Sequence, residues 1–231
     1  MIRMLDRTLE PEVMDTVDDA RDYDAMDHAA PNRAFVDRLK QLGARGYMLD
    51  LGTGPGHIPI MIAQEIAEAK VMAVDLSKNM LELAKKKLAA TTLGDRVDFE
   101  LADVKDLPFE DHVFDTVFSN TILHHIPEPI AMLREAWRVL KPGGLLLIRD
   151  LYRPSDEKAL DALVKQHAGT EGEHAQRMFR ESLCAALTPD ELREVAKHAG
   201  MEGGEVVFDT DQHMSLQRAA NHENTKSVYV I

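Results

Sequence analysis

Three glycines at alternate positions, in the stretch MLDLGTGPGHIP, constrain the fold of this chain more than any other feature. The apolar run before them ends at Asp50 and predicts a buried strand, and the amphipathic segment His57–Glu68 predicts a helix. A glycine-rich turn from strand to helix exposes bare backbone and the positive end of the helix to a ligand. The sequence therefore predicts a nucleotide-type site at Gly52, Gly54 and Gly56.

The spacing of these glycines argues against a dinucleotide. The dinucleotide fingerprint G-x-G-x-x-G would need a third glycine at His57 or at Pro59, depending on the register, and neither position carries one. Asp50 also places a carboxylate beside the loop, and a carboxylate suits a ligand amine better than a pyrophosphate. A nicotinamide-dependent oxidoreductase is therefore the weaker interpretation of this loop.

Length, charge and cysteine content narrow the class of protein. The 231 residues suffice for one well-buried α/β domain with additions, and the formal charge of −13 disfavours a nucleic-acid partner. The single cysteine, Cys184, favours a reducing compartment. The first residues lack the apolar core of a signal peptide, and no apolar run approaches the length of a membrane span. We expect a soluble cytoplasmic protein with no membrane span.

From position 45 onwards, the hydrophobic pattern alternates between strands and helices. Such alternation predicts βαβ units, and hence a doubly wound, Rossmann-like α/β fold whose seven-stranded sheet is mostly parallel. We expect strands near 46–51, 70–75, 96–101, 114–119 and 144–150, and helices near 56–68, 77–90 and 128–140. The stretch Lys141–Gly144 is expected to stop the last of these helices and turn the chain into the next strand.

Additions flank this core on both sides. Residues 1–44 are expected to form an N-terminal helical cap or lid, with helices over Asp18–His28 and Asn32–Leu42 broken at Pro31. After the fifth strand, 155–186 reads as a wholly helical insertion. A helix capped by Thr188 then runs to about His198, and strands over Glu205–Thr210 and His213–Arg218 close a domain that spans 45–220. A tail, 221–231, follows.

Polar side chains end three of the predicted strands. In open parallel sheets, ligands bind at the carboxyl ends of the strands, where the strand order reverses. Asp75 ends the second strand and is placed to accept hydrogen bonds from ribose hydroxyls, Asp103 follows the third, and Asn120 ends the fourth. Each also has a plainer interpretation, since Asp75 and Ser77 could begin a helix and Asp103 could cap a turn. Together they favour one nucleoside site.

The segments DLGTGPG, AVDLSKNML, LADVKDLPF, FDTVFSNTILHHI and WRVLKPGG, within about 45–151, carry a family resemblance. In combination they resemble the class I S-adenosylmethionine-dependent methyltransferases, of the small-molecule type seen in quinone-biosynthesis C-methyltransferases. The resemblance implies S-adenosyl-L-methionine as cofactor, S-adenosyl-L-homocysteine as product and a small-molecule acceptor, anionic or aromatic.

The resemblance also implies roles for individual residues. The glycine loop would pack against the methionine part of the cofactor, Asp75 would hold the ribose and Asp103 the adenine. The expected cofactor-binding set is Asp50, Gly52, Thr53, Gly54, Gly56, Asp75, Leu76, Asp103, Val104, Asn120, Thr121 and, from the lid, Tyr23. In this set Leu76 and Val104 would sandwich the adenine, and Asn120 and Thr121 would border the methyl group. Asp27, His28 and Asn32 are further candidate lid contacts.

Methyl transfer is an in-line displacement, so the enzyme contributes alignment, and it needs a general base only if the acceptor arrives protonated. Four candidates follow the fourth and fifth strands: His124, His125, Asp150 and Tyr152. A purely structural role for one of the two histidines is the alternative. No metal site is expected, because the histidines form no H-x-x-x-H pair and one cysteine makes no zinc ribbon.

Other interpretations of the site and of its neighbours stay open. The insertion and the strand before it hold arginines that would recognise an anionic acceptor, or would pair with nearby acids: Arg149, Arg153, Arg177 and Arg180. The sulfonium of the cofactor could instead undergo intramolecular displacement, or the chain could be a non-catalytic module. Nothing in the sequence specifies an oligomeric state.

Overall fold

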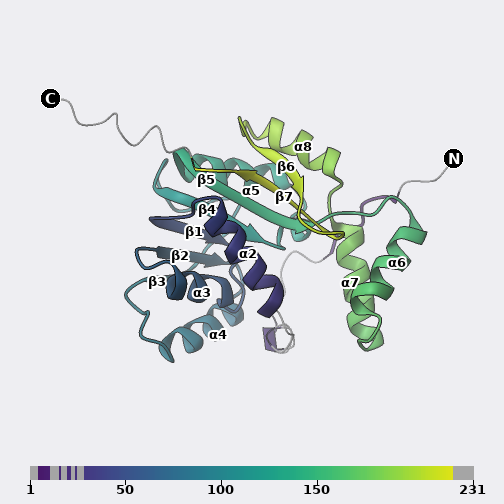
Figure 1. Cartoon of the computed structure of the whole chain (residues 1–231), viewed down its shortest axis with the longest axis horizontal. Coiled ribbons are helices and arrows are strands. Elements are labelled where there is room, and N and C mark those ends of the chain that lie inside the picture. The colour runs from purple at the N-terminus through teal and green to yellow at the C-terminus, as the bar shows by residue number, and fades with distance from the viewer. Residues whose placement is uncertain (1–4, 11–15, 17–19, 22–23, 25–28, 221–231) are drawn as a thin grey trace.

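The computed structural model describes residues 5–10, 16, 20–21, 24 and 29–220. Element labels follow Figure 1. The strands are β1 Tyr47–Leu51, β2 Lys70–Asp75, β3 Val97–Leu101, β4 Phe114–Asn120, β5 Leu140–Leu151, β6 Glu205–Phe208 and β7 His213–Arg218. The helices are α2 Ala29–Gln41, α3 His57–Glu65, α4 Lys78–Ala89, α5 Pro129–Val139, α6 Glu157–Ala168, α7 Glu173–Ala185 and α8 Pro189–His198, with a short 3-10 helix, η1, at Leu123–His125.

Within the described residues the strands form one seven-stranded sheet in the order β3-β2-β1-β4-β5-β7-β6. The first five strands run parallel, and β7 pairs antiparallel with both β5 and β6. The strand order reverses between β1 and β4, which is where an open parallel sheet binds its ligand. The predicted doubly wound, mostly parallel fold is confirmed.

Two helical layers cover the sheet, because neighbouring side chains on a strand point to opposite faces. On one face, Met48 and Phe118 pack with Phe35 of α2 and Ile62 of α3. On the other, Leu49, Val117 and Ile148 pack with residues of α5 and α8, among them Leu133 and Leu192. Strands buried on both faces explain the continuous apolar runs that identified them in the sequence.

The helical insertion lies apart from these two layers. Helices α6 and α7 project from one end of the sheet and pack on each other beyond the end of β5 (Figure 1). Leu151, Leu160 and Leu183 form the core of this unit, and Leu5 from the N-terminal segment packs against it. The division of the chain into a lid, a cofactor domain and a tail stays a prediction.

The boundaries of several elements differ from those predicted. Helix α2 begins at Ala29 and includes Pro31, which the first turn tolerates because its N–H would have no partner there. The 155–186 segment is two helices separated at 169–172. Lys141–Gly144 belongs to β5, whose register with β4 shifts between Phe114 and Thr116.

Elsewhere the predicted signals hold. Thr188 caps α8 with a complete capping box to Glu191, and Pro189 occupies the first turn. Most of the predicted helix over Asp18–His28, and the tail 221–231, lie outside the described residues. No helix in the described ranges is long and apolar enough to cross a membrane.

Candidate functional site

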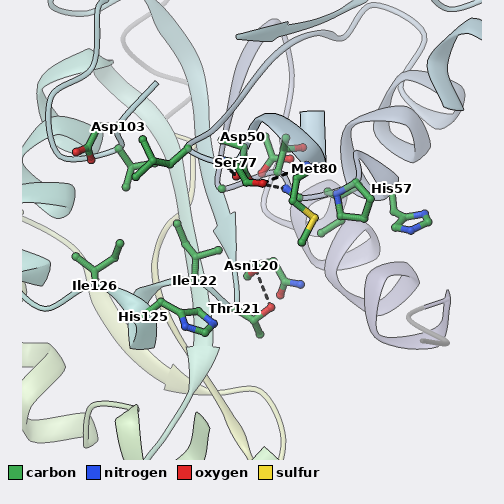
Figure 2. A pocket seen from close by; sticks show the side chains of 18 of the residues that line it. Asp50, His57, Ser77, Met80, Asp103, Asn120, Thr121, Ile122, His125 and Ile126 are labelled. Carbon is green, nitrogen blue, oxygen red and sulfur yellow. Dashed lines mark hydrogen bonds between the residues drawn. The ribbon is translucent and has the colours of Figure 1, made fainter. Parts of the chain in front are cut away.

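A pocket opens at the carboxyl ends of β1, β2 and β4, beside the point where the strand order reverses. Figure 2 shows side chains from the glycine loop, the start of α4 and the segment after β4 converging on it. Most of the expected cofactor-binding residues line this pocket, namely Asp50, Gly52, Thr53, Gly54, Asp75, Leu76, Asp103, Val104, Asn120 and Thr121. Residues far apart in the sequence therefore share one site, as the strand-end argument predicted.

The glycine loop is held by the neighbouring strand. The amides of Gly52 and Thr53 both donate to the Val74 carbonyl, each at 2.9 Å. Gly52 has a φ of 71°, and a Cβ there would lie 2.6 Å from the Ile122 side chain. Only glycine fits this backbone and this close approach.

Gly56, the third glycine of the loop, has a packing role. It does not line the pocket but caps α3, with a φ of 77°. A Cβ at this position would meet Ala84 at 2.8 Å and Phe99 at 2.9 Å. Gly56 therefore allows α3 to pack closely against α4 and β3.

Asp50 is a buried carboxylate that faces the pocket with an unused oxygen. Its side chain lies at the end of β1 and is 2% exposed. Among the described residues, neither its Oδ2 atom nor the Oγ1 atom of Thr53 has a hydrogen-bond partner. Burial, together with the charge of nearby Asp75, raises the pKa of Asp50 to about 7. A cationic ligand group would satisfy this carboxylate.

Asp75 organises the loop as well as facing the pocket. Its Oδ2 accepts from the Gly54 amide at 2.7 Å, and its Oδ1 accepts from the Ser77 amide at 2.8 Å. Ser77 in turn caps α4 by accepting from the Met80 amide. The plainer interpretation, a helix start, is therefore correct, and the same side chain also lines the pocket.

Asp103 lies at the opposite side of the pocket from α3, next to two apolar residues. Burial alone would raise the pKa of Asp103, but the Lys105 amide and ammonium, each 2.9 Å away, outweigh it and lower the pKa. Leu76 is 42% exposed and Val104 is 7% exposed, and both line the pocket. A flat apolar ligand group could pack against Leu76 and Val104, and Asp103 could accept a hydrogen bond from the edge of that group.

The end of β4 is fixed by Arg149. The Arg149 side chain is buried, donates to Asn120 Oδ1 at 2.8 Å and to the Pro31 carbonyl at 3.1 Å, and stacks over the Phe35 ring. Thr121 follows with a φ of 59°, and its hydroxyl donates to the Asn120 carbonyl (Figure 2). A left-handed β-branched residue is rare and strained, and such residues gather at functional sites.

Of the four candidate bases, only His125 lines the pocket. His124 is buried behind it, where its Nδ1 lies 2.6 Å from Asp150 Oδ1 and its amide donates to Asp150 Oδ2. Burial lowers the pKa of His124, but the Asp150 carboxylate outweighs burial and the pKa is raised. The Tyr152 hydroxyl donates to the Asp211 carbonyl, away from the pocket, so Tyr152 does not meet the site as predicted.

Several predicted contacts fall elsewhere. Tyr23, with Asp27 and His28, lies outside the described residues, whereas Asn32 is buried and lines the pocket. The four arginines considered for anion recognition do not line it. They bond locally instead, Arg149 to Asn120, Arg153 to Glu191, Arg177 to His174, and Arg180 to Asp161 and Glu157.

The sequence missed the residues that close the other end of the pocket. Ile122 and Ile126 line it beside His125, and Glu10, from the N-terminal segment, approaches both histidines. One potential ligand atom from each of Glu10, His124 and His125 lies within 4.8 Å of the others. Only the apolar spacing after β4 pointed to the two isoleucines, and no sequence signal pointed to Glu10.

A family model described as "Methyltransferase domain" matches residues 44–200. The chain belongs to the class I S-adenosylmethionine-dependent methyltransferases. The resemblance seen in the sequence motifs is confirmed.

Individual relatives agree with this family. The methyltransferase chain is 32% identical to a 27-O-demethylrifamycin SV methyltransferase from Amycolatopsis mediterranei, over 73% of this chain and 59% of the relative. It is 28% identical to a demethylmenaquinone methyltransferase from Symbiobacterium thermophilum, over 90% of this chain and 89% of the relative. A UbiE ubiquinone/menaquinone biosynthesis C-methyltransferase from Desulfotalea psychrophila matches at 37% identity, over 48% of this chain and 43% of the relative.

Solved structures give the same fold. A SAM-dependent methyltransferase from Aquifex aeolicus superposes with a TM-score of 0.68 at 21% identity, over 87% of this chain and 97% of that one. A phosphoethanolamine N-methyltransferase 2 from Haemonchus contortus, solved in complex with S-adenosyl-L-methionine, has a TM-score of 0.61 at 27% identity, over 79% of this chain and 39% of that one.

The pocket of this methyltransferase fits the cofactor of its family. S-adenosylmethionine carries an ammonium, a ribose and an adenine, and the pocket holds a matching order of groups. Asp50 offers a buried carboxylate oxygen without a partner, Asp75 lies next along the sheet, and Asp103 follows beside the exposed Leu76. The unsatisfied oxygen of Asp50 is the observation that most requires a ligand, since a buried carboxylate without a partner is costly.

Proposed function

We propose that this chain transfers the methyl group of S-adenosylmethionine to a small-molecule acceptor. The observation that carries the proposal is the division of the pocket into two chemically different ends. One end presents the Asp50 carboxyl, whose Oδ2 atom has no partner among the described residues, and the other presents His125 between Ile122 and Ile126. A cationic cofactor suits the first end, and an apolar acceptor with one ionisable group suits the second.

The proposed cofactor contacts follow from the charges and the exposure of the lining residues. Asp50 would pair with the ammonium of the methionine part, and the neighbouring Thr53 hydroxyl, which lines the pocket, would add a hydrogen bond. Asp75 would accept from the ribose hydroxyls, and Leu76 would cover the adenine ring. Asp103, kept ionised by Lys105, would accept from the adenine amine at the edge of the ring.

The proposed chemistry is an in-line displacement in which the chain supplies alignment. The bound cofactor supplies an activated methyl group on a sulfonium. Asn120, fixed by Arg149, and the strained Thr121 border the acceptor end and would align the acceptor oxygen or carbon with that methyl group. His125, the one candidate base that lines the pocket, would take a proton from the acceptor, while Asp150 and His124 support it from behind.

The acceptor proposed here is a largely apolar ring compound with an ionisable hydroxyl or an enol. The two isoleucines offer apolar surface, and one imidazole is the ionisable side chain beside them. The relatives include quinone-biosynthesis and rifamycin methyltransferases, which supports a small-molecule acceptor. An anionic acceptor has less support, because the four arginines bond to local partners.

We also infer action in the cytoplasm without a nucleic-acid partner. The formal charge of −13 and the single cysteine support this inference. The chain spans 43% and 59% of the first two curated relatives, so acceptor and partners are proposed for this chain and are not taken over from them.

The proposal is tested first by calorimetry with S-adenosylmethionine, S-adenosylhomocysteine and NAD, with Asp75→Ala as a loop variant. We expect tight binding of both sulfur compounds, loss of that binding in Asp75→Ala, and no heat with NAD. If the folded protein bound neither S-adenosylmethionine nor S-adenosylhomocysteine, the cofactor assignment would be overturned. Binding of NAD would favour the oxidoreductase interpretation.

Transfer itself is tested with methyl-labelled S-adenosylmethionine and a panel of hydroquinones, phenols and enols. Label in an acceptor together with released S-adenosylhomocysteine would support the proposed reaction. Consumption of the cofactor without label in any acceptor would instead favour intramolecular displacement. Binding without consumption would favour a non-catalytic module.

A further inference from the structure

The inner face of helix α2 is apolar except where it meets the pocket. Phe35, Val36 and Leu39 lie on this face at helical spacing and pack on the sheet. The same face begins with Asn32, which is only 7% exposed and lines the pocket. Its carboxamide hydrogen-bonds to no residue in the described part of the chain. Because burying an amide without a partner is costly, Asn32 needs a hydrogen-bonding group from a ligand.

Asn32 lies on the same side of the sheet as Asp50. Side chains alternate along a strand, so Asp50 shares the face of Met48, which packs with α2 and α3. Asp50 pairs in register with Phe118, and the ring centroid of Phe118 lies 6.0 Å from that of Phe35 in α2. The α2 side of the pocket therefore holds a buried amide together with a buried carboxyl.

A second carboxamide lies on this face, at the end of β4. Asn120 comes two residues after Phe118, so it points to the same side, and Figure 2 shows it with Asp50 among the side chains around the pocket. Its Oδ1 accepts from Arg149 Nε at 2.8 Å, so the amide presents its Nδ2 donors on the other side. Arg149 also donates to the carbonyl of Pro31, the residue before Asn32, at 3.1 Å. One guanidinium therefore holds both carboxamides at the same end of the pocket.

The charges here favour an anion beside the two amides and a cation at Asp50. The Arg149 guanidinium lies behind Asn120, and although burial lowers the pKa of Arg149 to about 10, it keeps its charge at neutral pH. Asp50 has a buried Oδ2 atom without a partner among the described residues, which suits an ammonium. An α-amino acid group carries an ammonium and a carboxylate on one carbon, so it satisfies both requirements.

We propose that Asn32 donates a hydrogen bond to the carboxylate of the methionine part of S-adenosylmethionine, with Asn120 beside it, while Asp50 takes the ammonium. This inference rests on the proposed function and extends it, because it makes α2 part of the cofactor site. It also gives the pocket a specificity, since nucleosides that lack the carboxylate lose this contact.

The first test is calorimetry with three ligands: S-adenosylmethionine, decarboxylated S-adenosylmethionine, which keeps the ammonium and the sulfonium, and methylthioadenosine, which has neither the ammonium nor the carboxylate. We expect Asn32→Ala to weaken S-adenosylmethionine binding at least about tenfold, because it removes a hydrogen bond to a charged group. The affinities for the other two ligands should stay within about twofold of wild type. Wild-type affinities for all three ligands in Asn32→Ala would overturn the proposal.

Asn32→Asp tests the sign of the charge at this position. It keeps the shape of the side chain but places a like charge against the carboxylate of the cofactor. We expect it to weaken S-adenosylmethionine binding more than Asn32→Ala does, and to leave decarboxylated S-adenosylmethionine bound at least as tightly as in wild type. An equal loss of all three ligands would contradict the assignment, because it would come from an altered pocket. This variant also keeps the proposal testable if thermal unfolding shows that Asn32→Ala does not fold.

Gln217→Ala is the matched control for a displaced helix. Gln217 anchors α2 to β7 by accepting from Arg38 at 3.2 and 2.7 Å, but it does not line the pocket. It should leave the affinities for all three ligands within about twofold of wild type. If Gln217→Ala reproduced the selective loss expected of Asn32→Ala, the position of α2 would explain that loss, and the role of the amide would be refuted.

These measurements separate the inference from the function on which it rests. If wild type binds S-adenosylmethionine and shows the expected selectivity but methylates no acceptor, the proposed transfer fails while the carboxylate contact holds. If an acceptor is methylated but Asn32→Ala keeps the wild-type ratio of affinities for S-adenosylmethionine and its decarboxylated form, the contact is refuted and the transfer stands. If wild type binds none of the three ligands, both are overturned.

Discussion

The two ends of the pocket are built in different ways. The cofactor end consists of strand ends and the loop after β1, and its key contacts are to backbone, such as the Gly54 amide on Asp75. The proposed acceptor end is lined by the segment after β4, which includes part of η1, and α7 and the N-terminal segment pack behind η1. The contacts behind this end join side chains from distant parts of the chain, such as Glu10 and Ser182. The first end is formed by the parallel sheet itself, and the second depends on the helical insertion and the N-terminal segment that this chain adds to the sheet.

This difference indicates which end can vary without loss of the fold. A sheet whose strand order reverses between β1 and β4 offers the cofactor end wherever a glycine loop follows β1. The acceptor end changes whenever the insertion or the N-terminal segment changes, so it is where acceptor specificity would be set. Variants at the cofactor end should therefore change mainly cofactor affinity, whereas variants at the acceptor end should change folding stability or kcat.

The largest effect is expected at Asp150. Asp150→Asn removes the charge of a buried pair and leaves His124 without its counterion, which should cost about 3–5 kcal/mol of unfolding free energy. Because Asp150 does not line the pocket, S-adenosylmethionine affinity of the folded fraction should stay the same. Chemical denaturation and calorimetry measure the two quantities.

Tyr152→Phe is the matched control for this variant. It removes a hydroxyl two residues further along the chain that bonds only the Asp211 carbonyl among the described residues, and should cost about 0.5–1 kcal/mol. If Asp150→Asn weakened cofactor binding as strongly as folding, the two ends would not be independent.

A second large effect is expected at the cofactor end, in Gly52→Ala. Its left-handed backbone costs about 1–2 kcal/mol with a Cβ, and the 2.6 Å approach to Ile122 forces a further shift of the loop. We expect S-adenosylmethionine binding to weaken at least tenfold, because the loop amides are displaced.

Gly94→Ala serves as its control, since a Cβ there would meet nothing within 4 Å. Its unfolding free energy and cofactor affinity should remain within about 0.5 kcal/mol of wild type. A Gly52→Ala protein that bound the cofactor normally would show that the loop backbone does not contact it.

A pH effect is expected at Asp50. Its pKa is about 7 in the folded state against an ordinary value of 3.8, so the folded state holds more protons between these values. Stability of the free protein should therefore fall as pH rises from about 4 to 7, with a limiting slope of about 1.4 kcal/mol per unit. Asp50→Asn should flatten this dependence, as thermal unfolding over pH 4–8 would show.

The same group makes cofactor binding depend on pH. An ammonium beside Asp50 favours its ionised form, so binding should release protons near pH 6 and strengthen as pH rises toward 7. Calorimetry in buffers of different ionisation enthalpy counts these protons. Proton release that persisted in Asp50→Asn would place the titrating group elsewhere.

The difference between the two ends also explains which parts of the structure the sequence could predict. The sheet and the strand ends that line the pocket were predictable because each signal is local: an apolar run, a glycine turn, and an acid such as Asp75 at the strand end. Gly56 was assigned to the ligand because sequence spacing cannot separate a ligand contact from the close packing that it makes against Ala84.

The acceptor end could not be predicted, since its contacts span most of the chain. Glu10 reaches Ser182 across 172 positions and Arg7 reaches Ala185 across 178, and no local pattern encodes such a pairing. The position of Tyr152 was unpredictable for a related reason. It follows β5 as expected, but its hydroxyl is taken by the hairpin loop at Asp211.

The smallest effect is expected at Arg149, which lies where the two ends meet. Its guanidinium holds Asn120 at the end of β4 and the Pro31 carbonyl of α2, and it stacks over Phe35. Arg149→Lys keeps a charge but cannot make both bonds from a planar fork. We expect about a fivefold weaker cofactor affinity, or about 1 kcal/mol, together with a similar loss in kcat.

Arg38→Lys is the matched control, because Arg38 also connects α2 to the sheet but through Gln217, which does not line the pocket. It should change neither affinity nor kcat by more than twofold. Arg149→Lys alone should move both quantities if Asn120, which lines the pocket, borders both cofactor and acceptor as proposed. If Arg149→Lys changed only the cofactor affinity or only kcat, Asn120 would act at one end of the pocket and not at both.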